Sequence, residues 1–524
     1  MRFGFWPRML AALVLVSITA RAATAEPQTS DPDSALAKTL RSIVGAPLAL
    51  DDAIQRALVH STDVAEAEAA LRAAEGVLRR ERGGFDPSLF ADATWSSEKR
   101  PRASVFAETE HGTHALDVGA AVDLQTGGHL EASVRSTRET TDAPFASFSP
   151  QYTTRGSIDL VQPLLKGFGP AARQDLSVAE RDLAAARAAA EATRRGIEAR
   201  VERSYWDLYA AERDYAVDQL LRDGGAAVLD EARTRARAGL GGPNQVATAR
   251  VFLADREVSL LDREERMDAL SDDLGTLLGA RPEGGVIRFR PTAEPPRDFT
   301  LGSTDAVVRE AMERNPTLQL YVQQADAARA RARGARWMAL PALDFVGSLG
   351  ANGLTGTGRT LPVFSNPDST QTLPSLGDFG DSWREVFQGD FPAWSAGVRF
   401  SLPLGLRADR GERDRTGAEV LVAEQHLEGA RRALEAQVRQ ACRELEHARE
   451  RLRLTAGGVE ASLEQVRIGR LEYQSGRTTA FELVRLAADL ATAEQHYSQA
   501  LVRAANAAAS LRELTAGAEP LANQ

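Results

Sequence analysis

The feature that most constrains this 524-residue chain is that its second half copies its first. The segment Arg194–Ala199 recurs as Arg431–Ala436, and Gly239 recurs as Gly476, so both matches lie 237 positions apart without a gap. An upstream block repeats at a second constant spacing of 254 positions, in which Asp51 matches Asp305, Ala57 matches Ala311 and Pro87 matches Pro341. Self-similarity at a fixed spacing predicts two tandem structural repeats rather than several unrelated domains.

Each half is expected to contain a helix, strands, a long helix, a turn and a further helix. The long segments show coiled-coil spacing, with small or apolar residues at alternating steps of four and three. These positions are Ile197, Val201, Ser204, Leu208, Ala211 and Tyr215 in the first half and Leu434, Val438, Ala441, Leu445, Ala448 and Leu452 in the second. The seam between Val246 and Leu277 is interrupted by Arg256 and Arg263. A helix over 171–238 would extend roughly 100 Å at ~1.5 Å per residue.

Between the helical segments the pattern changes to strict alternation, which predicts β-strands. We expect six strands of roughly nine to twelve residues, a length that lets a tilted strand cross a bilayer. They lie near 89–97, 115–124, 130–135, 156–162, 343–350 and 394–402. In the last strand, Trp394, Ala396, Val398, Phe400 and Leu402 are expected to face lipid, and Ser395, Arg399 and Ser401 to face water.

The connections between these strands differ in length, as they do in outer-membrane barrels. Gln125–Gly128 is a short turn, whereas 98–112, 139–153 and 351–392 read as long polar loops. Alternation alone is equally compatible with a soluble sandwich. Six strands cannot close a barrel, and an open edge in lipid costs several kcal/mol for each unpaired backbone group. A barrel would therefore be shared between copies. The hairpin 113–138 is expected either to join it or to fold away as a flap.

The N-terminus predicts export. Arg2 and Arg8, the apolar run Met9–Ile18 and Ala23-Thr24-Ala25 form the pattern of a secretory signal cleaved before Glu26. The only cysteine is Cys442, so neither a disulfide framework nor an acylated N-terminal cysteine is expected. The formal net charge of −10 argues against nucleic-acid binding.

The sequence gives no sign of catalysis. It contains no phosphate-binding glycine loop with its lysine, no nucleophile elbow, no HExxH and no Cys/His cluster. His111 and His114 lack a third ligand nearby and are expected to face solvent rather than a metal. We therefore expect no enzyme activity, no cofactor and no metal.

Four local features then carry a family resemblance. They are the strand entries Phe85–Leu89 and Gln162–Gly169 and the helical turns Ala238–Val246 and Tyr473–Leu483. Occurring in this order within two tandem repeats, they make the chain resemble the TolC family of outer-membrane efflux proteins. The resemblance implies a mixed α and β fold, with long coiled-coil hairpins and a trimeric barrel in the outer membrane. It also implies a periplasmic helical tunnel that meets a periplasmic adaptor and, through it, an inner-membrane pump or ABC exporter.

The same resemblance suggests site residues at the periplasmic entrance of the channel. Tyr473 and Glu482 match the family pattern, whereas Arg485 and Gln245 stand where the family often has acids. The turns that would contact the adaptor include Gly239, Leu240, Gly476, Arg477 and Thr478. One acidic ring from Glu482 is the feature carried over.

These expectations divide the chain into a signal peptide (1–25), two efflux repeats (26–279 and 300–516), a linker (280–299) and a flexible tail (517–524). The strands lie at about 88–162 and 343–402, and the helical hairpins at about 171–279 and 410–515. The predicted function is that of a passive conduit in tripartite efflux or type I secretion. The alternative is an exported coiled-coil adaptor or adhesin without a pore. The sequence does not indicate which cargo the channel would carry.

Overall fold

The protein is described from a computed structural model of the chain. The described residues are 32–101, 104, 107–239, 242–282, 288–299, 301–363, 366–475 and 477–517. The signal peptide, the turn residues Leu240 and Gly476 and most of the predicted tail lie outside them.

The chain forms two compact units, which are treated separately below. The hairpin unit comprises the described residues within Met1–Val44, Glu212–Glu264 and Val459–Gln495. The sheet unit comprises those within Gly45–Ala211, Glu265–Gly458 and His496–Gln524.

Four long helices contribute residues to both units. They are α4 (Gln174–Arg237), α5 (Pro243–Leu278), α9 (Arg407–Gln474) and α10 (Ala480–Leu514), and α1 (Pro32–Ser42) belongs to the hairpin unit. The predicted seams are buried: Val201, Leu208, Val438 and Leu445 are each 0% exposed. Heptad spacing therefore identified the packing faces of α4 and α9. The first long helix begins at Gln174 rather than near 171, because 170–173 form turns.

Shorter helices of the sheet unit follow the sequence signals for helix starts. Ser61 precedes α3 (Thr62–Gly83), and its hydroxyl accepts a hydrogen bond from the Val64 amide. Asn315 precedes α7 (Pro316–Met338) and accepts from the Leu318 amide. Both residues satisfy amide groups that a helix leaves unpaired at its start. The unit also contains α2 (Leu50–His60) and α6 (Thr304–Arg314).

A short parallel pair of strands, β1 (Ala46–Leu48) and β6 (Phe289–Pro291), is held against α4 by a buried tyrosine. The Tyr205 hydroxyl donates to the Leu48 carbonyl oxygen at 2.9 Å. It accepts from the amides of Thr292 and Ala293 at 3.0 and 2.9 Å. Tyr205 is fully buried, and its single oxygen satisfies polar backbone groups of β1 and of the two residues that follow β6.

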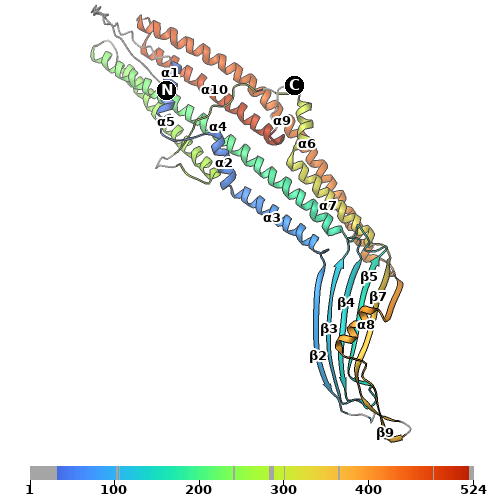
Figure 1. Ribbon diagram of the computed structural model, residues 1–524. Helices are drawn as coiled ribbons and strands as arrows, with labels where there is room; N and C mark the ends of the chain where they lie inside the picture. Colours follow the sequence, from blue (N-terminus) through green and yellow to red (C-terminus); the bar gives the residue numbers. More distant parts are fainter. Residues whose placement is uncertain are drawn as a thin grey trace, which may run out of the picture. The chain divides into compact units, whose positions relative to one another are not determined.

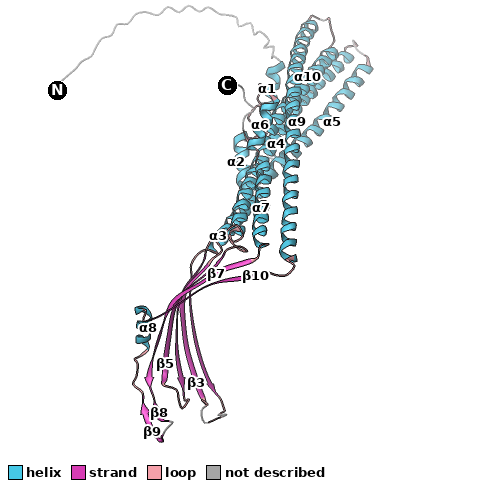
Figure 2. Ribbon diagram, turned by 90° about the vertical axis from the view of Figure 1, so that its right-hand side faces the viewer, coloured by secondary structure: helices cyan, strands magenta, loops and turns pink. Residues whose placement is uncertain are grey.

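The main sheet contains six antiparallel strands in the order β10-β7-β5-β4-β3-β2. Figure 1 shows them side by side beyond the ends of α3 and α7, and Figure 2 shows the same strands in magenta from a second direction. Their bounds are β2 Ser88–Lys99, β3 Glu110–Asp123, β4 His129–Thr141, β5 Phe148–Pro163, β7 Ala342–Gly358 and β10 Phe391–Ser401. All six predicted strands are present.

Three expectations about this region need correction. Strands β3, β4, β5 and β7 have 13 to 17 residues, more than predicted, because they continue into segments that read as polar loops. The supposed loop 351–392 also contains strands β8 (Thr360–Val363) and β9 (Asn366–Thr372) and helix α8 (Phe379–Gln388). Finally, the hairpin 113–138 pairs on both sides within the sheet, so its alternative as a separate flap is wrong.

Candidate functional site

The sheet has one apolar face, and cross-strand pairing defines it. Trp394 pairs with Leu349, which pairs with Ile158, and that residue pairs with Ala132. Paired residues point to the same side of a sheet, so these rows join into one surface. It continues through Val118 and Ala91, which are paired across β3 and β2. The predicted lipid-facing residues Trp394, Ala396, Val398 and Phe400 all belong to this face, which we call the apolar face.

The apolar face is exposed to an unusual degree for large hydrophobic side chains. Trp394 is 78% exposed, Val398 66% and Leu349 62%. An exposed apolar surface of this extent marks a contact with lipid or protein. The opposite face carries charged residues, including Asp117, Arg135 and Arg399. The Arg135 guanidinium bridges to the Asp117 carboxylate across β3 and β4. The alternation seen in the sequence thus gives the sheet one apolar face and one polar face.

At the tip of the hairpin unit, Tyr473 contacts the first hairpin. Its hydroxyl donates a hydrogen bond to the Glu231 carboxylate on α4, which raises the pKa of Tyr473, and burial acts in the same direction. Glu231 also pairs with Arg235 at 2.9 Å. Sequence reasoning found Tyr473 but missed Glu231, because nothing in the local pattern distinguishes this acid from the other charged residues of α4.

A cavity of about 310 Å³ lies at the same tip. It is lined by Glu231 and Arg235 of α4, Gln245 of α5, and Thr479 and Phe481 at the start of α10. Phe481 is half exposed. The structure therefore brings Gln245 and Glu231, the partner of Tyr473, to the same cavity. Arg477 and Thr478 lie in the adjoining turn, and Gly239 ends the first hairpin with φ +73°.

Glu482 lies in the first turn of α10, close to Arg485. Arg485 Nη2 is 3.2 Å from Glu482 Oε1, and the two side chains are 64% and 39% exposed. The Glu482 amide donates to the Thr479 hydroxyl, which fixes the start of the helix. At this exposure the pair contributes little stability, but it places a positive charge next to the acid.

A buried group of charges packs inside the hairpin unit. Arg263 of α5 lies 3.0 Å from Asp218 and 3.5 Å from Asp214, both on α4. Asp218 is 2% and Asp214 7% exposed. Burial raises the pKa of Asp214 to about 6. The nearby Asp218 also raises this pKa, whereas Arg263 and Arg213 lower it. The arginine that interrupts the seam is therefore the counter-ion of two buried carboxylates. We call this set the Arg263 cluster.

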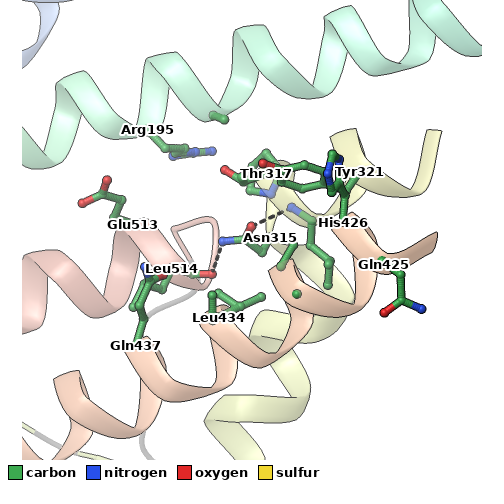
Figure 3. A pocket seen from close by; sticks show the side chains of 16 residues that line it. Arg195, Asn315, Thr317, Tyr321, Gln425, His426, Leu434, Gln437, Glu513 and Leu514 are labelled. Carbon is green, nitrogen blue, oxygen red and sulfur yellow. Dashed lines mark hydrogen bonds between the residues drawn. The ribbon is translucent and has the colours of Figure 1, made fainter. Parts of the chain in front are cut away.

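A second cavity, of about 680 Å³, lies in the sheet unit between α4, α7, α9 and the end of α10. Figure 3 shows the Asn315 side chain at its centre. Its amide donates to the Leu514 carbonyl at 3.0 Å, while its oxygen caps α7. Asn315 therefore joins two helix ends, and its bonding explains its burial without a ligand.

The two histidines considered as metal ligands lie on opposite faces of the sheet, because His111 and His114 are three positions apart on β3. Within the described ranges, no group of three or more His, Cys, Asp or Glu side chains is arranged to hold a metal ion. None of the helices in the described part of the chain is both long and apolar enough to cross a membrane.

Comparison with known proteins identifies the class. Residues 307–517 match the outer membrane efflux protein family. No curated protein sequence matches the chain. Among solved structures, it is similar to the outer-membrane channel OprN, with 18% identity, a TM-score of 0.60 and coverage of 90% of this chain and 91% of that one.

Two further channels have the same fold. The outer membrane protein VceC from Vibrio cholerae is 16% identical with a TM-score of 0.57, and the match covers 89% of this chain and 96% of VceC. The open-state channel MtrE from Neisseria gonorrhoeae is 16% identical with a TM-score of 0.57, and 90% of each chain is covered.

The fold, with its two-faced sheet, is that of outer-membrane channels. More particularly, residues 307–517 match the model of the outer membrane efflux protein family, the channel family that the sequence resembles. The predicted resemblance, the efflux-channel function and the outer-membrane location are confirmed. The adaptor or adhesin alternative gains no support. The family is one of channels rather than enzymes.

Proposed function

We propose that three copies of this chain, each built from two tandem repeats, form one passive conduit that works with a periplasmic adaptor and an inner-membrane pump. The observation that carries the trimer is the open six-stranded sheet, whose edge strands are β2 and β10. In lipid, unpaired backbone groups at such edges cost several kcal/mol each. An assembly that pairs β10 of one copy with β2 of the next removes both edges.

The strand directions permit this closure. Six antiparallel strands leave β2 and β10 running in opposite directions, so the new pair would also be antiparallel. Three sheets of six strands give eighteen strands, within the range of barrels that leave an aqueous channel. The helix bounds support the repeats: α2 and α6 start 254 positions apart, and α5 and α10 start 237 apart.

We expect the purified chain to be an obligate trimer. Its mass in detergent, measured by light scattering after subtraction of bound detergent, should equal three chains. Loss of the trimer on heating should change its electrophoretic mobility together with its strand content. A stable monomer that keeps full strand content would contradict closure between copies.

We also propose that Tyr473, Gln245, Glu482 and Arg485 lie at the periplasmic entrance, with Gly239, Arg477 and Thr478 in the turns that meet the adaptor. Support comes from the cavity that is lined by both Gln245 and Glu231, the partner of Tyr473, and from the Glu482–Arg485 pair. Three acids drawn together by trimer symmetry would attract cations, and the adjacent arginines would weaken this attraction.

Arg485→Ala should therefore raise the preference of the open channel for cations over anions. The measurement is the reversal potential of single channels in planar bilayers under a salt gradient. Glu482→Ala should shift it in the opposite direction, and Arg453→Ala, which removes a similar exposed pair on α9, should leave it unchanged. If neither Glu482→Ala nor Arg485→Ala changes the reversal potential, both residues lie outside the constriction.

A further inference from the structure

Helix α8 is unusual because it packs on the apolar face of the sheet. The Thr154 hydroxyl is 2.8 Å from the Ser382 hydroxyl of α8. Thr154 lies two and four positions before Gly156 and Ile158 on β5, within a regular stretch of pairing with β7. Residues at even spacing on a strand share a face. The helix therefore covers the same side of the sheet that carries Ile158, Leu349 and Trp394. Figures 1 and 2 both show α8 beside β5 and β7.

The sheet is shaped to receive this helix. A Cβ atom built on Gly156 would lie 2.8 Å from the Val386 side chain, and one on Gly353 would collide with the Ser382 carbonyl oxygen. At Gly353 only glycine permits so close an approach, because the obstacle is backbone, whereas a side chain at Gly156 would force Val386 to move. The two glycines face the helix from neighbouring strands, at the centre of the contact. The contact is thus encoded in the strands as well as in α8.

Hydroxyl groups buried under α8 form a connected set. Ser136 and Thr154 are paired at 2.9 Å, Thr154 continues to Ser382, and Ser382 donates to the Phe379 carbonyl at 2.8 Å. The Thr355 hydroxyl donates to the Asp378 carbonyl at 2.7 Å. Ser136, Thr154, Thr355 and Ser382 are all at most 2% exposed. A hydroxyl turned towards hydrocarbon without a partner is costly, so α8 makes these polar residues acceptable on an otherwise apolar wall.

The contacts also give the direction of α8. Asp378 meets Thr355, Ser382 meets Thr154, and Val386 meets Gly156. Four helical residues advance about 6 Å, close to two strand residues at about 3.3 Å each. The helix thus descends along the strands, and its last turn brings Phe387 towards the level of Ile158 and Leu349, where the exposed apolar surface begins.

The rest of α8 is strongly two-sided. Phe379, Trp383 and Phe387 follow one another at intervals of four residues, with successive ring centroids 6.1 Å apart. Phe387 is 74% and Phe379 42% exposed. The other side carries Arg384, which is 64% exposed and bridges to Asp381. An aromatic side next to a charged side is the pattern of a helix that lies at a membrane surface.

We propose that α8 is an interfacial helix on the outer wall of the barrel, with its aromatic stripe in the headgroup and upper acyl region of the outer leaflet. This inference rests on the proposed barrel, because it assumes that the apolar face meets lipid. The occupant is lipid rather than a protein partner because the stripe continues the exposed apolar surface of Ile158, Leu349 and Trp394. Aromatic rings at this level form the girdle typical of barrel interfaces.

Spin labels on the full-length protein in lipid nanodiscs test the proposal. In a Cys442→Ser background, single cysteines are introduced as Phe387→Cys, Arg384→Cys and Val398→Cys, and accessibility to oxygen and to an aqueous nickel chelate is measured. All three side chains are well exposed, so the labels should not disturb folding. We expect the oxygen-to-nickel ratio to be highest at 398, several-fold lower at 387 and lowest at 384.

The outcomes separate this inference from the proposed function. The label at position 398 can report lipid while the label at 387 is as accessible to nickel as the label at 384. In that case α8 lies in water and the inference is wrong. If both reagents are excluded from 387 while 398 reports lipid, the stripe packs against protein, which also overturns it. Nickel access at 398 would instead overturn the barrel orientation itself.

Discussion

Val398→Arg is expected to abolish the heat-resistant trimer and to remove the protein from the outer membrane. Val398 lies on the apolar face, paired with Phe345 and 66% exposed, so in the proposed barrel it points into hydrocarbon. An arginine at mid-depth on a barrel surface costs about 2–4 kcal/mol. Three copies would bring this to about 6–12 kcal/mol per assembly. The measurements are membrane fractionation and the mobility shift on heating.

The adjacent Gly397→Arg provides the matched control. It introduces the same side chain one position away, and therefore on the polar face. A Cβ atom at Gly397 meets no other atom within 4 Å, so the larger residue has space. We expect this variant to assemble. Assembly of Val398→Arg with failure of Gly397→Arg would show that the two faces have been assigned the wrong way round.

Arg263→Ala should cause the largest loss of stability in the helical part of the protein. The substitution leaves Asp214 and Asp218 in their buried positions without their shared counter-ion. Removing one partner of a buried ion pair costs several kcal/mol, here about 3 kcal/mol because Arg263 itself is partly exposed. Thermal unfolding followed by the helical circular dichroism signal measures this loss.

Arg256→Ala is the comparison, since Arg256 occupies the equivalent heptad position seven residues earlier on α5. Its guanidinium stacks over the Phe252 ring at 5.6 Å, a contact that contributes about 1 kcal/mol or less at such a site. A loss no greater for Arg263→Ala than for Arg256→Ala would mean that the Arg263 cluster does not hold α4 to α5.

The deficit of Arg263→Ala should also depend on pH. Burial raises the pKa of Asp214 from 3.8 to about 6, so the folded state binds this proton more tightly than the unfolded state. Its contribution to the free energy of unfolding is complete below about pH 4 and is lost as the pH rises through 6. Loss of the cation raises this pKa further. The deficit should therefore be larger at neutral pH than at pH 5, and a deficit unaffected by pH would exclude Asp214 as its source.

Periodicity in the sequence predicted the long helices and the six main strands of this protein. The heptads of α9 predicted a seam in which Val438 and Leu445 are fully buried, and the alternation around Trp394 predicted the face on which it lies. These predictions succeeded because the direction of a side chain follows from its position along a helix or strand.

Other features were decided only by contacts between distant parts of the chain. Ser382 meets Thr154, 228 residues earlier, and no local pattern specifies that a short helix from a polar loop will cover an apolar sheet face. Glu231 became a candidate site residue only because Tyr473 reaches it, and Arg263 was an interruption of a seam until Asp214 and Asp218 appeared beside it. The sequence by itself determined the long helices and the main strands and which of their faces are apolar, since both follow from local periodicity. Only the tertiary structure decided which polar side chains meet, because that depends on how separate elements pack.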